Sequence, residues 1–492
     1  MTQERRKIAF CASLVCMTCA GTLYLFGAYA QALQQKRSLS QTALNLIASS
    51  GGFGQYLSGP VWGKLSDTYD RQKLCAAAGV FLLAGYLGLA SGYASDLVPV
   101  PALALAYALI GLGSSGLFNA SLSTSVKNYD EREHGFAVGV PVAFFGLSAF
   151  IFSQLQRLFI VGSQASDNAP AGSVDIFSFL CFVGAVTGGG AMAGATFLYD
   201  CSASLRRRGL SQDGIEAGII TSPTTDASTR IESVSLVSTP ILPTVSGEQS
   251  PLIDNQSNQA EPLLEQPSIF AQQDAYLLFA AFILLTGTGL MYINNVGAIV
   301  IALIPKSTPT ATIQATQRLH VGLISICNCL GRVVTGLGSD RLMHQFKLTR
   351  LVGLVAGGGM ITAALLWGML GLYDGHAMSQ LIPVTLLLGF GYGSIFSAAP
   401  AIVGRWFGVQ RFGTNWGWFQ WAPAIGGQVC NLVFGLYVDA ARRAGGQLEC
   451  HGTVCFTGAF WLAFCGCCAS VGILLALNQM RGGWIVTRSA DV

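Results

Sequence analysis

Twelve apolar runs, each about 20 residues long, constrain this chain more than any other feature of its sequence. A helix of about that length is needed to cross the hydrocarbon core of a bilayer. The composition agrees, because 52% of the 492 residues are hydrophobic and only 10% are charged, whereas soluble domains have about 25% charged residues. The sequence therefore predicts an all-α integral membrane protein with 12 transmembrane helices. The predicted spans are 8–29, 43–62, 74–93, 101–122, 136–156, 176–199, 275–304, 319–337, 351–372, 379–403, 413–437 and 456–477.

A polar segment separates the sixth span from the seventh. Residues 200–273 are rich in Ser, Thr, Gln and Pro and show no helical periodicity, a composition typical of disordered chain. The predicted organisation is a six-helix bundle over 1–199, a disordered linker over 200–273, a second six-helix bundle over 274–480 and a tail over 481–492.

The distribution of Lys and Arg predicts which side of the membrane each loop faces. Nineteen of the 27 basic residues lie in the termini, the linker and the loops on the side of the N terminus, and seven lie on the other side. Cytosolic loops of membrane proteins carry the excess of positive charge. Both termini and the linker are therefore predicted to be cytosolic.

Two charged loops with the same spacing indicate an internal duplication. The pattern Gly-x-x-x-Asp occurs at 63–67 after the second span and at 336–340 at the end of the eighth, 273 positions later. In addition, 109–139 aligns on 387–417 without a gap, at an offset of 278. Parallel repeats of this kind build two bundles that rock against each other.

These stretches resemble the major facilitator superfamily over nearly the whole chain outside the linker. The loop 63–73 is similar to the signature of that family between spans two and three, and 336–341 is similar to its weaker copy. Residues 21–29 and 51–67 are similar to the nodulin-like branch, which includes fungal monocarboxylate-permease homologues of the vacuolar membrane. The resemblance implies the major facilitator fold, transport activity and a vacuolar location. The plasma membrane is the alternative location, because the physics of the sequence does not separate the two.

The eighth span is similar to that of monocarboxylate transporters, with two departures. The matching residues are Asn328, Arg332, Gly336 and Asp340. Monocarboxylate transporters carry an aspartate where this chain has Asn328, and a lysine in the first span that this chain lacks. Both departures argue against proton-coupled transport of lactate or pyruvate.

Arg332 is the only formal charge well inside a predicted span. A charge at the bilayer centre costs about 2.5–3.5 kcal/mol on insertion scales, and such residues normally face a cavity and bind something. Arg332 is therefore predicted to anchor an anionic group of a substrate, with Asn328 one turn away on the same helix face. The alternatives are that Arg332 extends to the cytosolic surface or pairs with Asp340 two turns away.

Further polar side chains inside the spans are candidates for contacts with the substrate. Asn294 and Asn295 lie with Tyr292 in an apolar run. Adjacent amides in a span need hydrogen-bond partners, which a substrate cavity or neighbouring helices can supply. Other candidates, for which bonding between helices is the simpler explanation, are Tyr24, Asn45, Asn119, Gln154 and Gln420.

The two charged loops are candidates for a cytosolic gate. Asp67 is predicted to accept hydrogen bonds from a helix N terminus in the opposite half, or from Arg71, and so to hold the gate closed. Asp340 with Arg341 is predicted to do the same in the second half. The alternative is an ordinary solvated turn, which contributes little energetically. The predicted gating residues are Gly63, Asp67, Arg71, Gly336, Asp340 and Arg341.

The linker contains a candidate sorting signal. Glu248, Leu252 and Ile253 fit an acidic dileucine pattern that a cytosolic sorting adaptor could bind. No P-loop, metal cluster, cofactor motif or nucleophile–base pair stands out, so neither a cofactor nor an enzymatic activity is expected. The net charge of +3 is spread over loops, which does not favour a nucleic-acid partner. The expected partners are a small-molecule substrate, the lipid bilayer and the adaptor, and the protein is expected to be a monomer.

The sequence predicts a secondary transporter or facilitator that moves a small solute, with an organic anion favoured, by alternating access. No buried Asp or Glu offers an obvious proton relay, so the coupling ion stays open. The alternative is a non-transporting nutrient sensor or scaffold that signals through the linker. Solute uptake by reconstituted vesicles separates the two.

Overall fold

The computed structural model describes residues 2–159, 175–201, 269–305, 307–371, 377–445 and 451–485, and these residues are almost entirely helical. The helices are α1 (Thr2–Ala20), η1 (Gly21–Ala28), α2 (Ala30–Lys36), α3 (Gln41–Leu57), α4 (Gly59–Thr68), α5 (Arg71–Ala94), α6 (Val100–Lys127), η2 (Glu131–Glu133), α7 (His134–Leu155), η3 (Gln156–Phe159), α8 (Ile176–Phe197), η4 (Ile269–Ala271), α10 (Gln273–Leu303), α11 (Thr310–Phe346), α12 (Leu351–Gly371), α13 (Ala377–Trp406), α14 (Phe412–Phe419), α15 (Trp421–Gly445) and α16 (Val454–Met480).

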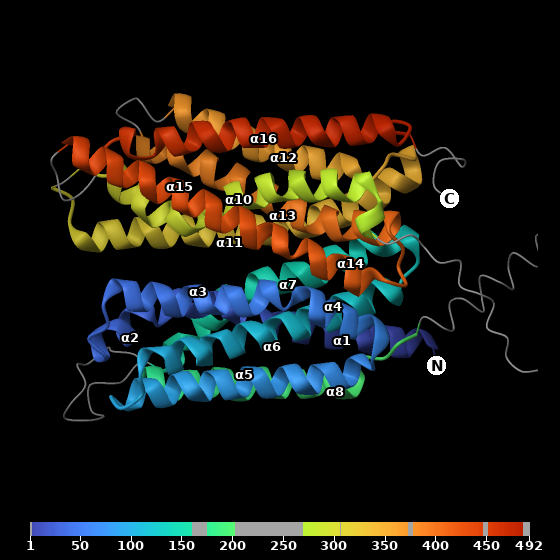
Figure 1. Ribbon diagram of the computed structural model, residues 1–492, viewed down its shortest axis with the longest axis horizontal. Helices are drawn as coiled ribbons and strands as arrows, with labels where there is room; N and C mark the ends of the chain where they lie inside the picture. The colour runs from blue at the N-terminus through green and yellow to red at the C-terminus, as the bar shows by residue number, and fades with distance from the viewer. Residues whose placement is uncertain are drawn as a thin grey trace, which may run out of the picture. The chain divides into compact units, whose positions relative to one another are not determined.

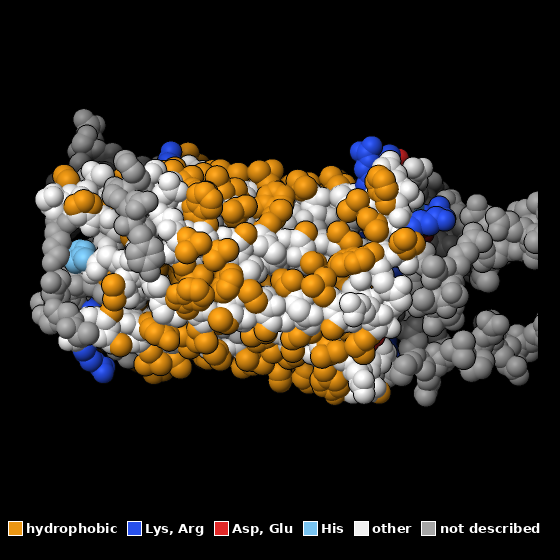
Figure 2. All heavy atoms as spheres, turned by 90° about the horizontal axis from the view of Figure 1, so that it is seen from above, with side chains coloured by type: hydrophobic (Ala, Val, Ile, Leu, Met, Phe, Trp, Pro, Cys, Tyr) orange, Lys and Arg blue, Asp and Glu red, His pale blue; other side chains and the backbone are white. Residues whose placement is uncertain are grey.

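Within the described ranges, eleven helical segments are long and apolar enough to cross a membrane. The remaining predicted span, 43–62, is divided between α3 and α4, which have 17 and 10 residues and meet at Ser58. Pro60 explains the division, because proline lacks the N–H of a helical hydrogen bond and crowds the preceding turn. Figure 2 shows apolar side chains over the middle of one face, with Lys and Arg at its two ends. The chain is thus a multi-pass membrane protein.

The helices form two six-helix bundles, an N bundle of α1–α8 and a C bundle of α10–α16 (Figure 1). In the N bundle α5 packs against α6 and α8, and in the C bundle α12 packs against α13 and α16. These are corresponding helices of the two sequence repeats, so the duplication is present in the packing.

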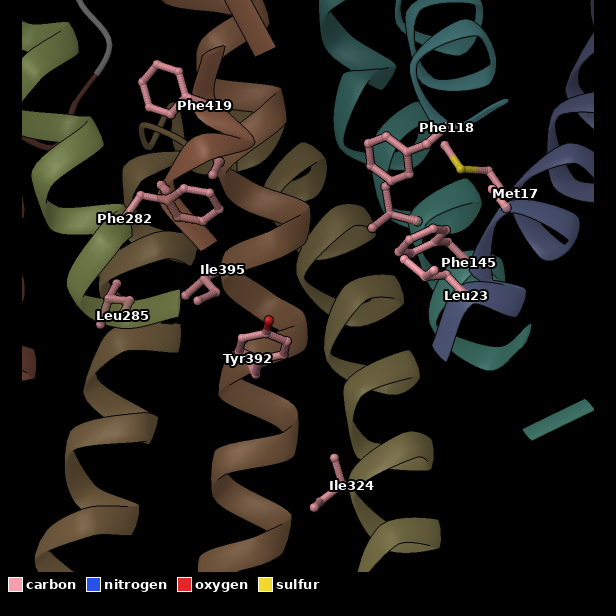
Figure 3. Close-up of a cluster of buried hydrophobic side chains, with 14 of the residues drawn as sticks. Met17, Leu23, Phe118, Phe145, Phe282, Leu285, Ile324, Tyr392, Ile395 and Phe419 are labelled. Carbon is pink, nitrogen blue, oxygen red and sulfur yellow. The ribbon is translucent and has the colours of Figure 1, made fainter. Parts of the chain in front are cut away.

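Buried apolar side chains of both bundles belong to one hydrophobic cluster, part of which is drawn in Figure 3. Met17, Leu23, Phe118 and Phe145 lie together on the N-bundle side of the close-up, whereas the side chains of α10, α13 and α14 gather on the other. This cluster extends through both bundles.

The two bundles meet where α1 begins and α16 ends, which we call the terminal end (Figure 1). There α4 packs across α14, and α7 packs across α11. Glycines allow this approach. A Cβ on Gly413 would lie 2.5 Å from the backbone oxygen of Gly63, and a Cβ on Gly336 would collide with the backbone oxygen of Gly135. The predicted gating glycines, Gly63 and Gly336, therefore lie where helices of different bundles cross.

Candidate functional site

Asp67, near the end of α4, binds the first turn of α14 in the other bundle. Its carboxylate accepts hydrogen bonds from the N–H groups of Gly413 (3.1 Å) and Thr414 (2.6 Å), and from the Thr414 hydroxyl (2.8 Å). The first N–H groups of a helix have no partner within the helix and lie at the positive end of its dipole. Lys127 on α6 adds a second positive partner, with Nζ 2.6 Å from Oδ1 of Asp67.

Asp340, near the end of α11, makes the corresponding contact with the N terminus of α7. Its carboxylate accepts hydrogen bonds from the N–H groups of Gly135 (2.8 Å) and Phe136 (2.7 Å). Nη2 of Arg350 lies 2.7 Å from Oδ1 of Asp340. Burial lowers the pKa of the Arg350 guanidinium and the Asp340 carboxylate raises it, and the arginine stays protonated. We call the Asp67–α14 and Asp340–α7 contacts the clasp.

The basic residues that the sequence paired with the clasp carboxylates, Arg71 and Arg341, do not make these contacts. Arg71, the alternative partner of Asp67, donates to the backbone oxygen of Ser66 (3.2 Å) and pairs with Asp200. Asp67 instead binds the helix N terminus of the opposite bundle, which was the other possibility that the sequence left open.

Arg341 is exposed, and the basic partner of Asp340 is Arg350, which comes after the helix has ended. Lys127 and Arg350 were not predicted. Lys127 is the last residue of α6, and Arg350 directly precedes α12. Nothing in the sequence around them indicates which carboxylate they contact.

Arg332 lies on the face of α11 that meets the N bundle, and it is only 4% exposed. Its Nη1 donates to the backbone oxygen of Val142 on α7, and a Cβ on Gly146 would collide with the guanidinium. Both residues lie at least two turns from the start of α7, so the side chain points into the membrane and away from the terminal surface. Within the described residues Arg332 forms no ion pair with Asp340, and its Nε has no hydrogen-bond partner.

Tyrosines from both bundles lie around Arg332. The hydroxyls of Tyr24 on η1 and Tyr56 on α3 are 2.9 Å apart, and both side chains lie near Arg332. Tyr392 on α13 also lies near Arg332, and the centroid of its ring is 4.8 Å from that of the Phe396 ring. Tyr24 is 47% exposed, so its ring is accessible next to a buried cation.

Asn328, one turn from Arg332, is half-buried, and its Oδ1 has no hydrogen-bond partner in the described part of the chain. Asn328 and Tyr24 are thus two polar side chains near Arg332, and Tyr24 is the exposed one of the two. Tyr56 and Tyr392 were not predicted, because a single tyrosine in an apolar run does not show which side of its helix faces the other bundle.

Tyr292 is fully buried inside the C bundle. Its hydroxyl lies 2.7 Å from Oγ1 of Thr385, which lies 2.7 Å from Nδ1 of His320. This network joins α10, α11 and α13 and gives hydrogen-bond partners to the Tyr292 hydroxyl and to Nδ1 of His320. The contacts of Tyr292 are therefore those of packing within the C bundle.

Asn295 also bonds within the C bundle. Its Nδ2 donates to Oδ1 of Asn431 on α15 (2.8 Å) and to the backbone oxygen of Met291 (2.8 Å). Asn294, next to it, is exposed. The contacts of Asn295 are those of helix packing, the alternative that the sequence left open. The candidate sorting residues Glu248, Leu252 and Ile253 lie outside the described residues.

The Thr385→Val substitution is expected to lower thermal stability without changing the response to a solute. Valine keeps the shape but leaves Tyr292 and His320 without their shared partner, and interhelical hydrogen bonds in membranes contribute about 1 kcal/mol each. Melting of the purified protein, with and without a solute that stabilises the wild type, measures both effects. A lost solute response with normal melting would instead place this network in the solute site.

The fold and the site define a class of protein: two repeated helical bundles in a membrane, closed against each other at one end, with a buried cation between them. The family model of the Major Facilitator Superfamily matches residues 8–427, and the chain belongs to this superfamily. Family and fold together make it a secondary transporter of a small solute.

Two relatives cover nearly the full length of the chain. The "Probable transporter MCH1" of Gibberella zeae is 27% identical over 530 residues, which cover 98% of this chain and 91% of the relative. The "Probable transporter mch1" of Neurospora crassa is 25% identical over 560 residues, which cover 97% and 90%.

Solved structures share the fold at low sequence identity. The proton:xylose symporter XylE is similar with a TM-score of 0.63 and 10% identity, over 96% of each chain. A bacterial homologue of the iron transporter ferroportin, in an outward-facing state, is similar with a TM-score of 0.63 and 10% identity, over 96% of this chain and 99% of the other. These likenesses concern the fold alone.

Proposed function

We propose that the transported solute is a small organic anion, which Arg332 binds between the two bundles. The observation that carries this proposal is a 4% exposed arginine with no carboxylate bound to it among the described residues and with an unpartnered Nε. A buried cation is costly unless a counter-charge and hydrogen bonds compensate it. A carboxylate of the solute would supply both. Tyr24 and Asn328 offer neutral hydrogen-bonding groups beside it.

We further propose that the clasp is the gate of an alternating-access cycle. Both clasp carboxylates bind backbone N–H groups of the opposite bundle, so the terminal end opens only when those bonds break. Motion of one bundle against the other around a fixed site is how such repeat transporters work.

The terminal end is proposed to face the cytosol. The excess of Lys and Arg on the side of the N terminus supports this orientation. A second observation concerns the opposite end, where Cys455 at the start of α16 is disulfide-bonded. Disulfides persist in oxidising compartments and are rare in the cytosol. Cys450, which shares a loop with Cys455 in the sequence, lies outside the described residues.

A vacuolar location is proposed on the similarity of 21–29 and 51–67 to the nodulin-like branch. The acidic dileucine pattern at 248–253 would then direct sorting through a cytosolic adaptor. Fluorescence microscopy of the tagged full-length chain, with and without substitution of Leu252 and Ile253, tests both statements.

Uptake by vesicles that contain the purified protein tests the proposed solute class. We expect saturable uptake of at least one labelled organic anion from a panel of mono-, di- and hydroxycarboxylates, and competition by its unlabelled form. Uptake of neutral solutes only would contradict the anion proposal. No uptake at all, together with a cellular response that depends on residues 200–273, would favour a nutrient sensor.

Asp67→Asn is expected to loosen the terminal end. The amide loses the charge that strengthens bonds to the N–H groups of α14, and Lys127, whose side chain is 9% exposed, loses its ion-pair partner. A cysteine at the fully buried Ser66 is then expected to react with a maleimide several-fold faster.

Asp70→Asn is the matched control, because Asp70 lies in the same loop but caps its own helix through the N–H of Gln72 (3.0 Å). All three proteins compared carry the cysteine at Ser66. Equal labelling rates with Asp67→Asn, with Asp70→Asn and with neither change would show that Asp67 does not hold this end closed.

A further inference from the structure

A reciprocal amide pair joins the two bundles at a point that none of the functional assignments above explains. Nε2 of Gln420 donates to Oδ1 of Asn119 (2.8 Å), and Nδ2 of Asn119 lies 3.5 Å from Oε1 of Gln420. Asn119 lies on α6 of the N bundle, and Gln420 lies between α14 and α15 of the C bundle. Both are buried, at 2% and 6% exposure.

The sequence repeat places this pair at the same depth as Arg332. The offset of 273 relates Gly59 to Arg332, and the offset of 278 relates Val142 to Gln420. At one crossing Arg332 donates to Val142, and at the other a Cβ on Gly59 would lie 2.8 Å from Oε1 of Gln420. Two ties therefore join the bundles at corresponding positions, one made by a cation and one by neutral amides.

Both ties lie deeper in the membrane than the clasp. Asp67 follows Gly59 by eight positions on α4, and Asp340 follows Arg332 by eight positions on α11, which corresponds to about 12 Å along a helix. When the terminal end opens, the two ties, which lie deeper in the membrane than the clasp, must therefore separate as well.

We propose that Asn119 and Gln420 form a latch that holds the bundles together at this depth and is released each time the terminal end opens. They are positioning residues, and this role rests on the proposed alternating access. An anion can compete with the Val142 carbonyl for Arg332, because a carboxylate is the stronger acceptor for a guanidinium. The neutral amide pair has no such competitor. The latch thus keeps the terminal end closed when an anion has drawn Arg332 away from Val142. The terminal end opens only when the hydrogen bonds between Asn119 and Gln420 break as well.

Hydrogen–deuterium exchange of the full-length protein in lipid nanodiscs tests the latch without any solute. The first turns of α7 and α14 report on opening, because their N–H groups are protected by Asp340 and Asp67. We expect Asn119→Ala and Gln420→Ala each to speed exchange of these turns several-fold. The double variant should be no faster than the faster single one, since the two residues make one interaction. The length-swapped pair Asn119→Gln with Gln420→Asn should restore slow exchange.

A second amide pair provides the matched control. Nδ2 of Asn295 likewise donates to Oδ1 of Asn431 (2.8 Å), but both residues belong to the C bundle. Asn295→Ala and Asn431→Ala are expected to lower the melting temperature and to leave exchange of the two reporter turns unchanged.

The latch would be overturned by unchanged exchange in Asn119→Ala and Gln420→Ala, or by equal acceleration in the control pair. Additive single effects with no rescue by the swapped pair would overturn it as well. Because no solute is used, failure to find an anionic substrate leaves this test intact. If Asp67→Asn also leaves exchange of the two reporter turns unchanged, the result would instead contradict the proposal that the clasp is the gate.

Discussion

Arg332→Ala is expected to abolish binding of the anionic solute in both thermal-stabilisation and uptake assays. Removing one partner of a buried, hydrogen-bonded charge pair costs about 2–5 kcal/mol, which corresponds to a loss of affinity of at least about 30-fold. The variant should still fold, because in the described structure Arg332 makes one hydrogen bond, to the Val142 backbone, and no ion pair. A screen of anions by melting temperature, repeated on the variant, measures the effect.

Two further substitutions make this result specific. Arg332→Lys keeps the charge but loses the planar fork of donors, so an intermediate affinity is expected. Arg37→Ala controls for the loss of any buried arginine, since the Arg37 side chain is 7% exposed and binds backbone oxygens within the N bundle. It should lower stability and leave solute affinity unchanged. Anions that stabilise Arg332→Ala as strongly as the wild type would show that Arg332 is structural.

Gly336→Ala is expected to hold the terminal end open and to reduce transport about tenfold or more. The new Cβ would collide with the backbone oxygen of Gly135 and lie 3.0 Å from Cα of Gly139, so α7 and α11 must move apart. Overpacking of this kind costs about 1–3 kcal/mol, here only in the closed arrangement. Spin labels at the exposed positions Arg132 and Gln345 should show a longer mean distance across this crossing.

Gly338→Ala is the control for this prediction. It makes the same change on the same helix two residues later, where a Cβ would meet nothing within 4 Å. Transport and label distances close to those of the wild type are expected. Equal effects of the two substitutions would mean that helix propensity, and not contact between the bundles, explains the result.

The span count and the two-bundle architecture were predictable, because apolar runs and the repeat offsets are properties of the chain itself. The division of the second span into two helices was not predictable. The run 43–62 looked continuous, whereas the helix divides at Ser58 before Pro60. The sequence predicts that this run is apolar enough for a span, but the angle between its two halves depends on how α4 packs across α14.

Residues of the candidate site were predictable where a charge or a repeated spacing distinguished them from the residues around them in the sequence. Arg332 stands out as a charge among apolar residues, and Asp67 stands out through its repeated spacing. Tyr292 and Asn295 stood out in the same way, yet their bonds to Thr385 and Asn431 lie inside one bundle. A polar residue in a span needs a partner, and the one-dimensional pattern does not say whether that partner is protein or solute.

The chain alone thus specifies how many helices cross the membrane, that they form two related sets, and which charges must be compensated there, since each of these follows from local composition or from internal similarity. Only the folded arrangement decides the pairing. It brings Lys127 to Asp67, Arg350 to Asp340 and Asn119 to Gln420. The physical reason is that a hydrogen bond or ion pair depends on separations of about 3 Å in space, and helix packing sets these independently of separation along the sequence.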